Sequence, residues 1–112
     1  MTVKKISDGI ELTTSAVDVY VVPTSFVTDI ETIIVCNKTN STKTVTLQWY
    51  NASDTHTHSL LNTTDVPSYS FVRIEKPLYL EAGDKLIALA SANSAVDLSF
   101  RAQEQFTPIR SS

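Results

Sequence analysis

The sequence predicts an all-β protein, an antiparallel β-sandwich that is jelly-roll-like and has about eight strands. The first observation is a period of two in short β-branched segments, which is typical of half-buried strands. It is clearest in residues 44–50, where Val45, Leu47 and Trp49 share one face, and it returns in residues 95–102. The second is that clusters of Asn, Thr and Ser cut the chain about every 8–12 residues, a spacing typical of sandwiches. No segment has a helical period of comparable strength.

The expected elements form a single β-sandwich domain over residues 1–112, with a short N-terminal arm at 1–9 and a C-terminal tail at 104–112. Pro23 and Pro77 lack the backbone N–H that a strand ladder needs, so we expect strands to end beside them. The strands expected between these breaks span residues 11–14, 17–22, 27–37, 44–50, 58–61, 69–75, 78–80, 85–92 and 95–103.

Two of the expected strands, 27–37 and 85–92, carry apolar residues on both parities. In a lone antiparallel sandwich the outer face of each sheet is exposed to solvent. Either a bulge therefore shifts the alternation of inward and outward residues, or both faces of these strands are covered. If both are covered, the outward residues contact another subunit, or they pack under a loop or a terminal arm. The arm and the tail are further candidates for reaching a neighbour. The predicted contact residues are Ile33, Val35, Ile87, Leu89, Lys4, Lys5, Phe106 and Ile109.

Composition excludes several classes of protein. The 112 residues carry a formal net charge of −3 and lack the basic face of a nucleic-acid-binding domain. No apolar run approaches the roughly 20 residues of a membrane helix, and Met1–Asp8 lacks the apolar core of a signal peptide. The single cysteine, Cys36, permits no intrachain disulfide. It lies in an apolar run and is expected to be a small buried hydrophobe, in a chain made and assembled in a reducing cytosol.

No catalytic or cofactor motif is recognisable, so we expect no enzyme activity and no cofactor. The chain has two glycines, too few for a nucleophile elbow, and its two histidines are His56 and His58. On a strand these two side chains share a face, but two imidazoles do not fill a metal site. Threefold symmetry could gather six such nitrogens at an axis. The alternative is that both are exposed polar residues at a loop edge.

Aromatic residues leave a sugar-binding hypothesis open. Trp49 follows Val45 in the alternating pattern and is expected in the core. Tyr50 and Tyr20, with Asn51, could instead form a stacking platform for a carbohydrate. A carbohydrate-binding module is therefore an alternative of a different class.

Two blocks of sequence resemble small β-sandwich virion proteins of tailed bacteriophages. The first is Val-Tyr-Val-Val-Pro at 19–23, followed by an apolar strand ending in Cys-Asn-Lys-Thr at 36–39 and by Thr-Val-Thr-Leu at 44–47. The second is Lys-Pro-Leu-Tyr-Leu-Glu-Ala-Gly-Asp-Lys-Leu at 76–86. The glycine that often follows the proline in the first turn is replaced here by Thr24.

The resemblance implies a virion structural protein, most of all a capsid decoration (cement) protein that binds symmetry-related shell sites. A neck or tail adaptor, or a fibre-attachment protein, is the alternative within the virion. The implied partners are the major capsid protein or neck and tail proteins, together with copies of the same chain, with a trimer favoured. The implied localisation is the virion, assembled in the host cytoplasm.

Overall fold

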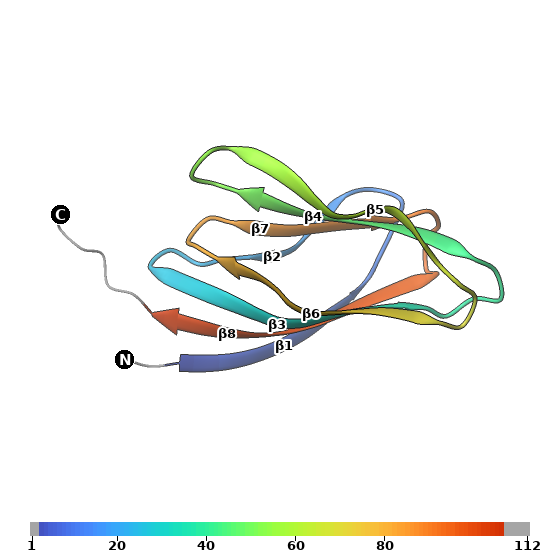
Figure 1. Cartoon of the computed structure of the whole chain (residues 1–112), viewed down its shortest axis with the longest axis horizontal. Coiled ribbons are helices and arrows are strands. Elements are labelled where there is room, and N and C mark those ends of the chain that lie inside the picture. The colour runs from blue at the N-terminus through green and yellow to red at the C-terminus, as the bar shows by residue number, and fades with distance from the viewer. Residues whose placement is uncertain (1–2, 107–112) are drawn as a thin grey trace.

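The computed structural model describes residues 3–106 and shows eight β-strands in them (Figure 1). These strands confirm the expected all-β class. Within residues 3–106 no helix is long and apolar enough to cross a membrane. The strands are β1 (Val3–Glu11), β2 (Val17–Val21), β3 (Phe26–Asn37), β4 (Lys43–Asn51), β5 (His56–Val66), β6 (Phe71–Leu80), β7 (Lys85–Ala90) and β8 (Val96–Phe106).

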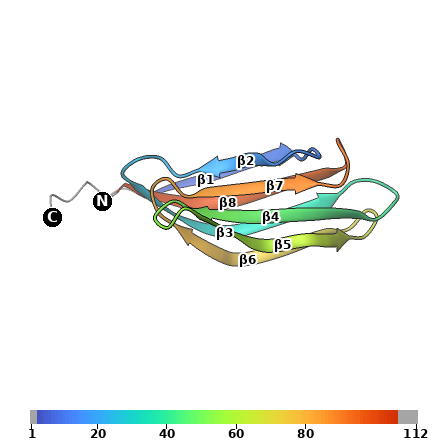
Figure 2. The ribbon, with the colours of Figure 1, turned by 90° about the horizontal axis from the view of Figure 1, so that it is seen from above.

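The strands form two antiparallel four-stranded sheets that stack face to face (Figure 1). The first sheet has the order β1-β8-β3-β6 and the second has the order β2-β7-β4-β5. Successive strands mostly alternate between the sheets, so each sheet mixes strands from both halves of the chain, as Figure 2 shows from above. Eight strands wound in this order form a jelly roll, which confirms the predicted sandwich.

The core lies between the sheets and is built from alternate residues of each strand. In β7, Leu86, Ala88 and Ala90 are buried while the residues between them are half-exposed. In β8 the same alternation runs from Val96 to Glu104. This is the period of two that predicted the strands. Leu12, Ile30, Leu47, Leu80, Leu98 and Val66 are among the fully buried side chains.

A bulge in β3 decides which of its apolar residues face the core. The register of β3 shifts between Ile30 and Thr32 against both neighbouring strands. Residue 31 is an extra residue opposite β8, whereas β6 has two residues, 76 and 77, opposite residue 31. Beyond the bulge, Ile33 and Val35 point inward and are 0% exposed. The expectation that these two lie on an outer face is therefore wrong. The bulge, which was one of the two explanations for the mixed parity, is the correct one for β3.

The terminal segments are more ordered than expected. Residues 3–11 form edge strand β1, which pairs with β8 along its whole length, so the predicted arm at 1–9 and strand at 11–14 are both wrong. Residues 104–106 complete β8, and the rest of the predicted tail lies outside the described residues.

Two further expected breaks are absent from the structure. β6 continues through Pro77 to Leu80 instead of stopping, which an edge strand tolerates because one side of its backbone is unpaired. β5 extends to Val66, through residues that the sequence predicts as a loop.

The two blocks that resemble virion proteins build turns. Asn37, which is fully buried, accepts hydrogen bonds from the backbone N–H of Thr39 at 2.9 Å and from its hydroxyl at 2.7 Å. Its amide donates to the carbonyls of Ser41 at 2.8 Å and Val66 at 2.9 Å. The side chain thus holds the β3–β4 turn against the end of β5.

The Ala-Gly-Asp step works in a similar way between β6 and β7. Asp84 is 3% exposed, and its carboxylate accepts from the backbone N–H of Glu81 at 3.0 Å and of Ala52 at 2.9 Å. It therefore ties its own turn to the β4–β5 turn. Gly83 has a φ of 87°, a left-handed conformation that side chains disfavour. The residues of this motif therefore build a turn.

We predict that Asn37→Ala destabilises the protein by about 1–3 kcal/mol, because the buried carbonyl of Val66 loses its donor from Asn37. Urea unfolding monitored by tryptophan fluorescence would measure the change. Asn40→Ala is the matched control, since Asn40 lies in the same turn but is exposed, and its effect should stay within about 0.5 kcal/mol. Equal effects of the two substitutions would contradict the role given to Asn37.

Candidate interaction surfaces

The outer face of the second sheet carries two of the predicted contact residues, Ile87 and Leu89. Both are half-buried there. Ile87 lies between Asp18 of β2 and Gln48 of β4, and Leu89 lies opposite Thr46. These neighbours are polar or short, so the two side chains form a small apolar strip on a polar face. Their role as contact residues stays a prediction.

A charged group borders this strip at its β6–β7 end. The Lys85 ammonium is 3.4 Å from the Asp18 carboxylate and 5.6 Å from the centre of the Tyr50 ring. A cation over a ring face is attracted by the ring quadrupole, so Tyr50 is held beside Lys85. Val21, which is opposite Lys85 in β2, is 44% exposed. The outer face therefore combines exposed apolar groups with charges that are already paired.

The predicted sugar platform of Tyr50, Tyr20 and Asn51 is not formed. Tyr50 points outward, whereas Tyr20 points between the sheets and its ring lies 5.5 Å from that of Phe100. Asn51 accepts hydrogen bonds from Ser53 within its own turn. The alternation of β2 is broken by a bulge between Asp18 and Tyr20, which turns the tyrosine inward.

Tyr20 instead belongs to a buried polar group that sequence reasoning missed. Its hydroxyl donates to the Glu104 carboxylate at 2.5 Å and lies 2.7 Å from the Thr28 hydroxyl. Glu104 is 8% exposed and Thr28 is 0% exposed, so the group bridges the sheets in the interior. Burial, followed by the hydrogen bond to Glu104, raises the pKa of Tyr20 far above its usual value. This group therefore links the two sheets.

His56 and His58 lie on the same side of β5, as the i and i+2 spacing predicts. The two rings are 5.9 Å apart with planes at 29°, and His58 lies 5.1 Å from the Trp49 ring. Trp49 is half-buried instead of fully in the core, and its buried indole N–H has no hydrogen-bond partner among the described residues. Both histidines are exposed, and residues 3–106 contain no group of three metal-ligating side chains. The pair therefore forms an aromatic stack at the hairpin end.

Cys36 is exposed, so the expectation of a buried cysteine is wrong. The bulge in β3 places it on the outer face, opposite Phe71 of β6 and Asp97 of β8. Phe71 is 61% exposed. Asp97, which lies opposite Cys36, forms an ion pair with Lys38 at 3.2 Å, and Lys38 also forms an ion pair with Glu11. The hydrogen bond with Glu11 raises the pKa of Lys38, and the same bond lowers that of Glu11.

Three of the terminal contact candidates, Lys4, Lys5 and Phe106, lie in strands. Lys4 and Lys5 are exposed in β1. Phe106, at the end of β8, is 45% exposed and its ring lies 5.5 Å from that of Phe26. Ile109 lies outside the described residues.

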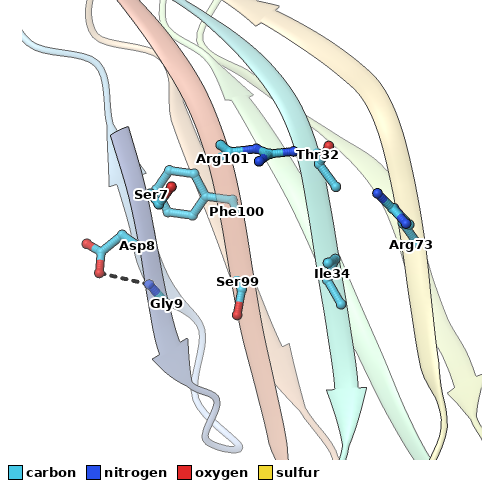
Figure 3. A pocket seen from close by; sticks show the side chains of 9 residues that line it. All are labelled: Ser7, Asp8, Gly9, Thr32, Ile34, Arg73, Ser99, Phe100 and Arg101. Atoms are coloured by element: carbon cyan, nitrogen blue, oxygen red, sulfur yellow. Dashed lines mark hydrogen bonds between the residues drawn. The ribbon is translucent and has the colours of Figure 1, made fainter. Parts of the chain in front are cut away.

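The outer face of the first sheet has a shallow hollow of about 480 Å³ (Figure 3). Gly9 lines it, and a Cβ at that position would lie 3.3 Å from the carbonyl oxygen of Leu98 in the paired strand. Arg101 and Arg73 reach over it from β8 and β6. Arg73 is 2.7 Å from Glu75, and Arg101 is 3.8 Å from Glu31. Because each guanidinium has a carboxylate partner, the hollow lacks the free positive charge of an anion site. The remaining lining residues are Ser7, Asp8, Thr32, Ile34, Ser99 and Phe100.

Comparisons with known proteins support the fold and no more. No protein-family model matches the chain, and no curated protein matches its sequence. Among solved structures it is similar to a chain from work reporting that "Bacillus endospore appendages form a novel family of disulfide-linked pili". The TM-score is 0.56 and the identity is 16%, over 95% of this chain and 87% of that chain. An all-β sandwich related in shape to a pilus protein is therefore shown, and a phage family is not identified.

We predict that Tyr20→Phe lowers the free energy of unfolding by about 1–3 kcal/mol near neutral pH, because buried Glu104 loses its donor. Tyr79→Phe is the matched control, since Tyr79 is 60% exposed, and should change stability by less than about 0.5 kcal/mol.

The same variant tests the raised pKa of Tyr20. Above pH about 10 the unfolded chain loses this proton while the folded chain keeps it, so stability falls as pH rises. Denaturant unfolding between pH 8 and pH 11, about the range in which tyrosine begins to ionise, should show a steeper loss in the native chain than in Tyr20→Phe. Parallel pH profiles would show that Tyr20 does not titrate differently in the two states.

Proposed function

We propose that this chain is a non-enzymatic structural subunit of a virion, in the first place a capsid decoration protein of a tailed bacteriophage. It binds the major capsid protein at symmetry-related sites and is assembled in the host cytoplasm. The observation that supports this most is the distribution of apolar side chains on its surface. The recognisable motifs of the chain are used for turns. Five large apolar side chains are exposed, namely Val21, Tyr69, Phe71, Tyr79 and Phe106.

Exposed aromatic residues are the usual anchors of protein interfaces. Tyr69 and Phe71 lie at one end of the sandwich, where β5 turns into β6. Val21 and Phe106 lie at the other end, where β2 and β8 finish (Figure 1). With Ile87 and Leu89 on a sheet face, the molecule offers apolar contacts in several directions. That arrangement suits a subunit held between neighbours more than one that closes around a small ligand.

The jelly-roll strand order is compatible with this role, because viral capsid domains use it, although lectin domains do so too. The resemblance of residues 17–102 to virion proteins of tailed phages adds the more specific expectation. In a decoration protein each contact can be weak, because the symmetric lattice multiplies it.

A pilus-like assembly is the competing structural role. The similar solved chain comes from pili described as disulfide-linked, and Cys36 is exposed here. However, these 112 residues hold one cysteine. One thiol per subunit links a single pair of chains, whereas a continuous covalent filament needs at least two linkages per subunit. Cys36 alone therefore does not favour that form of assembly.

We predict that purified particles of the encoding phage contain the chain in hundreds of copies, the number expected if it occupies shell lattice sites. Quantitative mass spectrometry against the major capsid protein measures this ratio. About 3–18 copies would move the protein to the neck or tail, where symmetry is low-order. Absence from particles would overturn both virion roles.

We also predict that Ile87→Asp reduces binding to capsids at least about tenfold, because the introduced carboxylate would be buried without a partner. Co-sedimentation of the folded variant with capsids that lack the native protein gives the measurement. Ile34→Asp is the matched control, since Ile34 is half-buried on the opposite outer face. If Ile87→Asp binds as well as the native chain, the second-sheet face is not the shell contact.

A further inference from the structure

Four strands lie at the edges of the two sheets, and three of them are interrupted. β2 has five residues and shifts register against β7. β5 shifts register twice against β4, and β6 shifts register against β3 and contains Pro77. Short strands, bulges and prolines are the means by which proteins prevent unwanted edge pairing.

Among these four edge strands, β1 alone is long, contains no proline and pairs without a register shift. Its nine residues pair with β8 from Val3 to Glu11 without a register shift. Figures 1 and 2 show it at the border of the first sheet, with β8 on one side and no strand of that sheet on the other. A long regular edge with one row of unpaired backbone groups is a template for another strand.

The side chains of β1 that point to the interior side form an unusual alternation. They are Lys4, Ile6, Asp8 and Ile10, which lie opposite Glu104, Ala102, Phe100 and Leu98 of β8. Ile6 and Ile10 pack against the core, whereas Lys4 and Asp8 are exposed. Asp8 accepts the backbone N–H of Gly9 at 2.8 Å. Neither charge forms an ion pair within residues 3–106. Inward charges on an edge strand discourage random pairing.

The same charges are complementary to those of a second copy in one register. When two β1 strands pair antiparallel with Ile6 opposite Ile6, Lys4 of each lies opposite Asp8 of the other. This register overlaps residues 3–9 of both copies. A register centred on Ser7 instead places Ile6 opposite Asp8, and one centred on Asp8 places the two Asp8 carboxylates together. Opposite charges directly across a strand pair stabilise it, and like charges destabilise it.

We propose that two copies of this chain associate through β1, in the register centred on Ile6, to form a continuous eight-stranded sheet across a twofold axis. The occupant of the β1 edge is thus a second copy, and the interface is isologous. A twofold pair differs from the trimer that the phage resemblance implies. The inference concerns the isolated chain and is tested without capsids, so its failure would leave the proposed virion role untouched.

The central experiment measures mass by light scattering over a range of protein concentration. The native chain is expected to have the mass of a dimer, twice that of the 12.3 kDa protomer. Lys4→Asp alone places two aspartates across each contact, and Asp8→Lys alone places two lysines there. Each is expected to raise the dissociation constant at least tenfold. Lys5→Asp is the matched control, because Lys5 lies opposite Ser7 in this register and its reversal should have a smaller effect.

Mixing the two weakened variants supplies the most specific outcome. In the mixed pair, the aspartate introduced at position 4 lies opposite the lysine introduced at position 8, and native Lys4 lies opposite native Asp8. The mixture is therefore expected to form a heterodimer, and the double variant Lys4→Asp/Asp8→Lys to recover the homodimer. A mixture that stays monomeric, when each variant is folded by circular dichroism, would overturn the proposed register.

A cross-link tests the register without changing a charge. In a Cys36→Ser background, Ile6→Cys brings two thiols together at the twofold axis and is expected to give a covalent dimer on mild oxidation. Ile10→Cys in the same background is the control, because that position faces no residue of 3–11 of the second copy. Equal cross-linking of both variants, or a native chain that is monomeric at about 1 mM, would overturn the proposal.

Discussion

The phase of β3 is the constraint on which much of the structure depends. β3 is an interior strand of its sheet and pairs with both β8 and β6, and its register shifts against both between Ile30 and Thr32. A slip of one residue exchanges the two faces of a strand. The bulge therefore sends Ile33 and Val35 into the core and leaves Cys36 outside, and it lets Asn37 turn inward to hold the β3–β4 turn.

The two sheets are also joined by polar contacts, and these explain why some surface chemistry suggested by sequence is missing. Tyr20 carries a hydroxyl into the interior, where Glu104 and Thr28 satisfy it. Asp84 and Asn37 are buried for the same reason, because each satisfies backbone donors or acceptors at a turn. Buried polar groups that are fully paired favour one packing over others. Tyr20, which the sequence suggested for a sugar platform, is in this protein used to fix the fold.

The sequence was sufficient to predict the interior strands and edge strand β2, and insufficient at the other three edges. β4 and β8 direct alternate apolar residues to the core, so the period of two is strong in residues 44–50 and 95–102, whereas β7 is apolar on both parities. β1, β5 and β6 are edge strands whose borders face solvent, so exposed polar residues and Pro77 interrupt the pattern. The pairing of Tyr20 with Glu104, 84 positions apart, depends on two bulged registers that no local pattern reveals.

The charged groups on the surface differ in whether they have an ion-pair partner within residues 3–106. On the outer faces, Arg73, Arg101 and Lys85 each have a carboxylate neighbour, so these cations exert little net attraction on an incoming ligand. On β1, Lys4 and Asp8 have no such ion-pair partner within residues 3–106. In the proposed dimer, Lys4 and Asp8 of one copy pair with Asp8 and Lys4 of the other, and this complementarity selects the register. If both proposals hold, the exposed apolar faces supply weak contacts and the β1 edge supplies orientation, which are together what a repeating assembly requires.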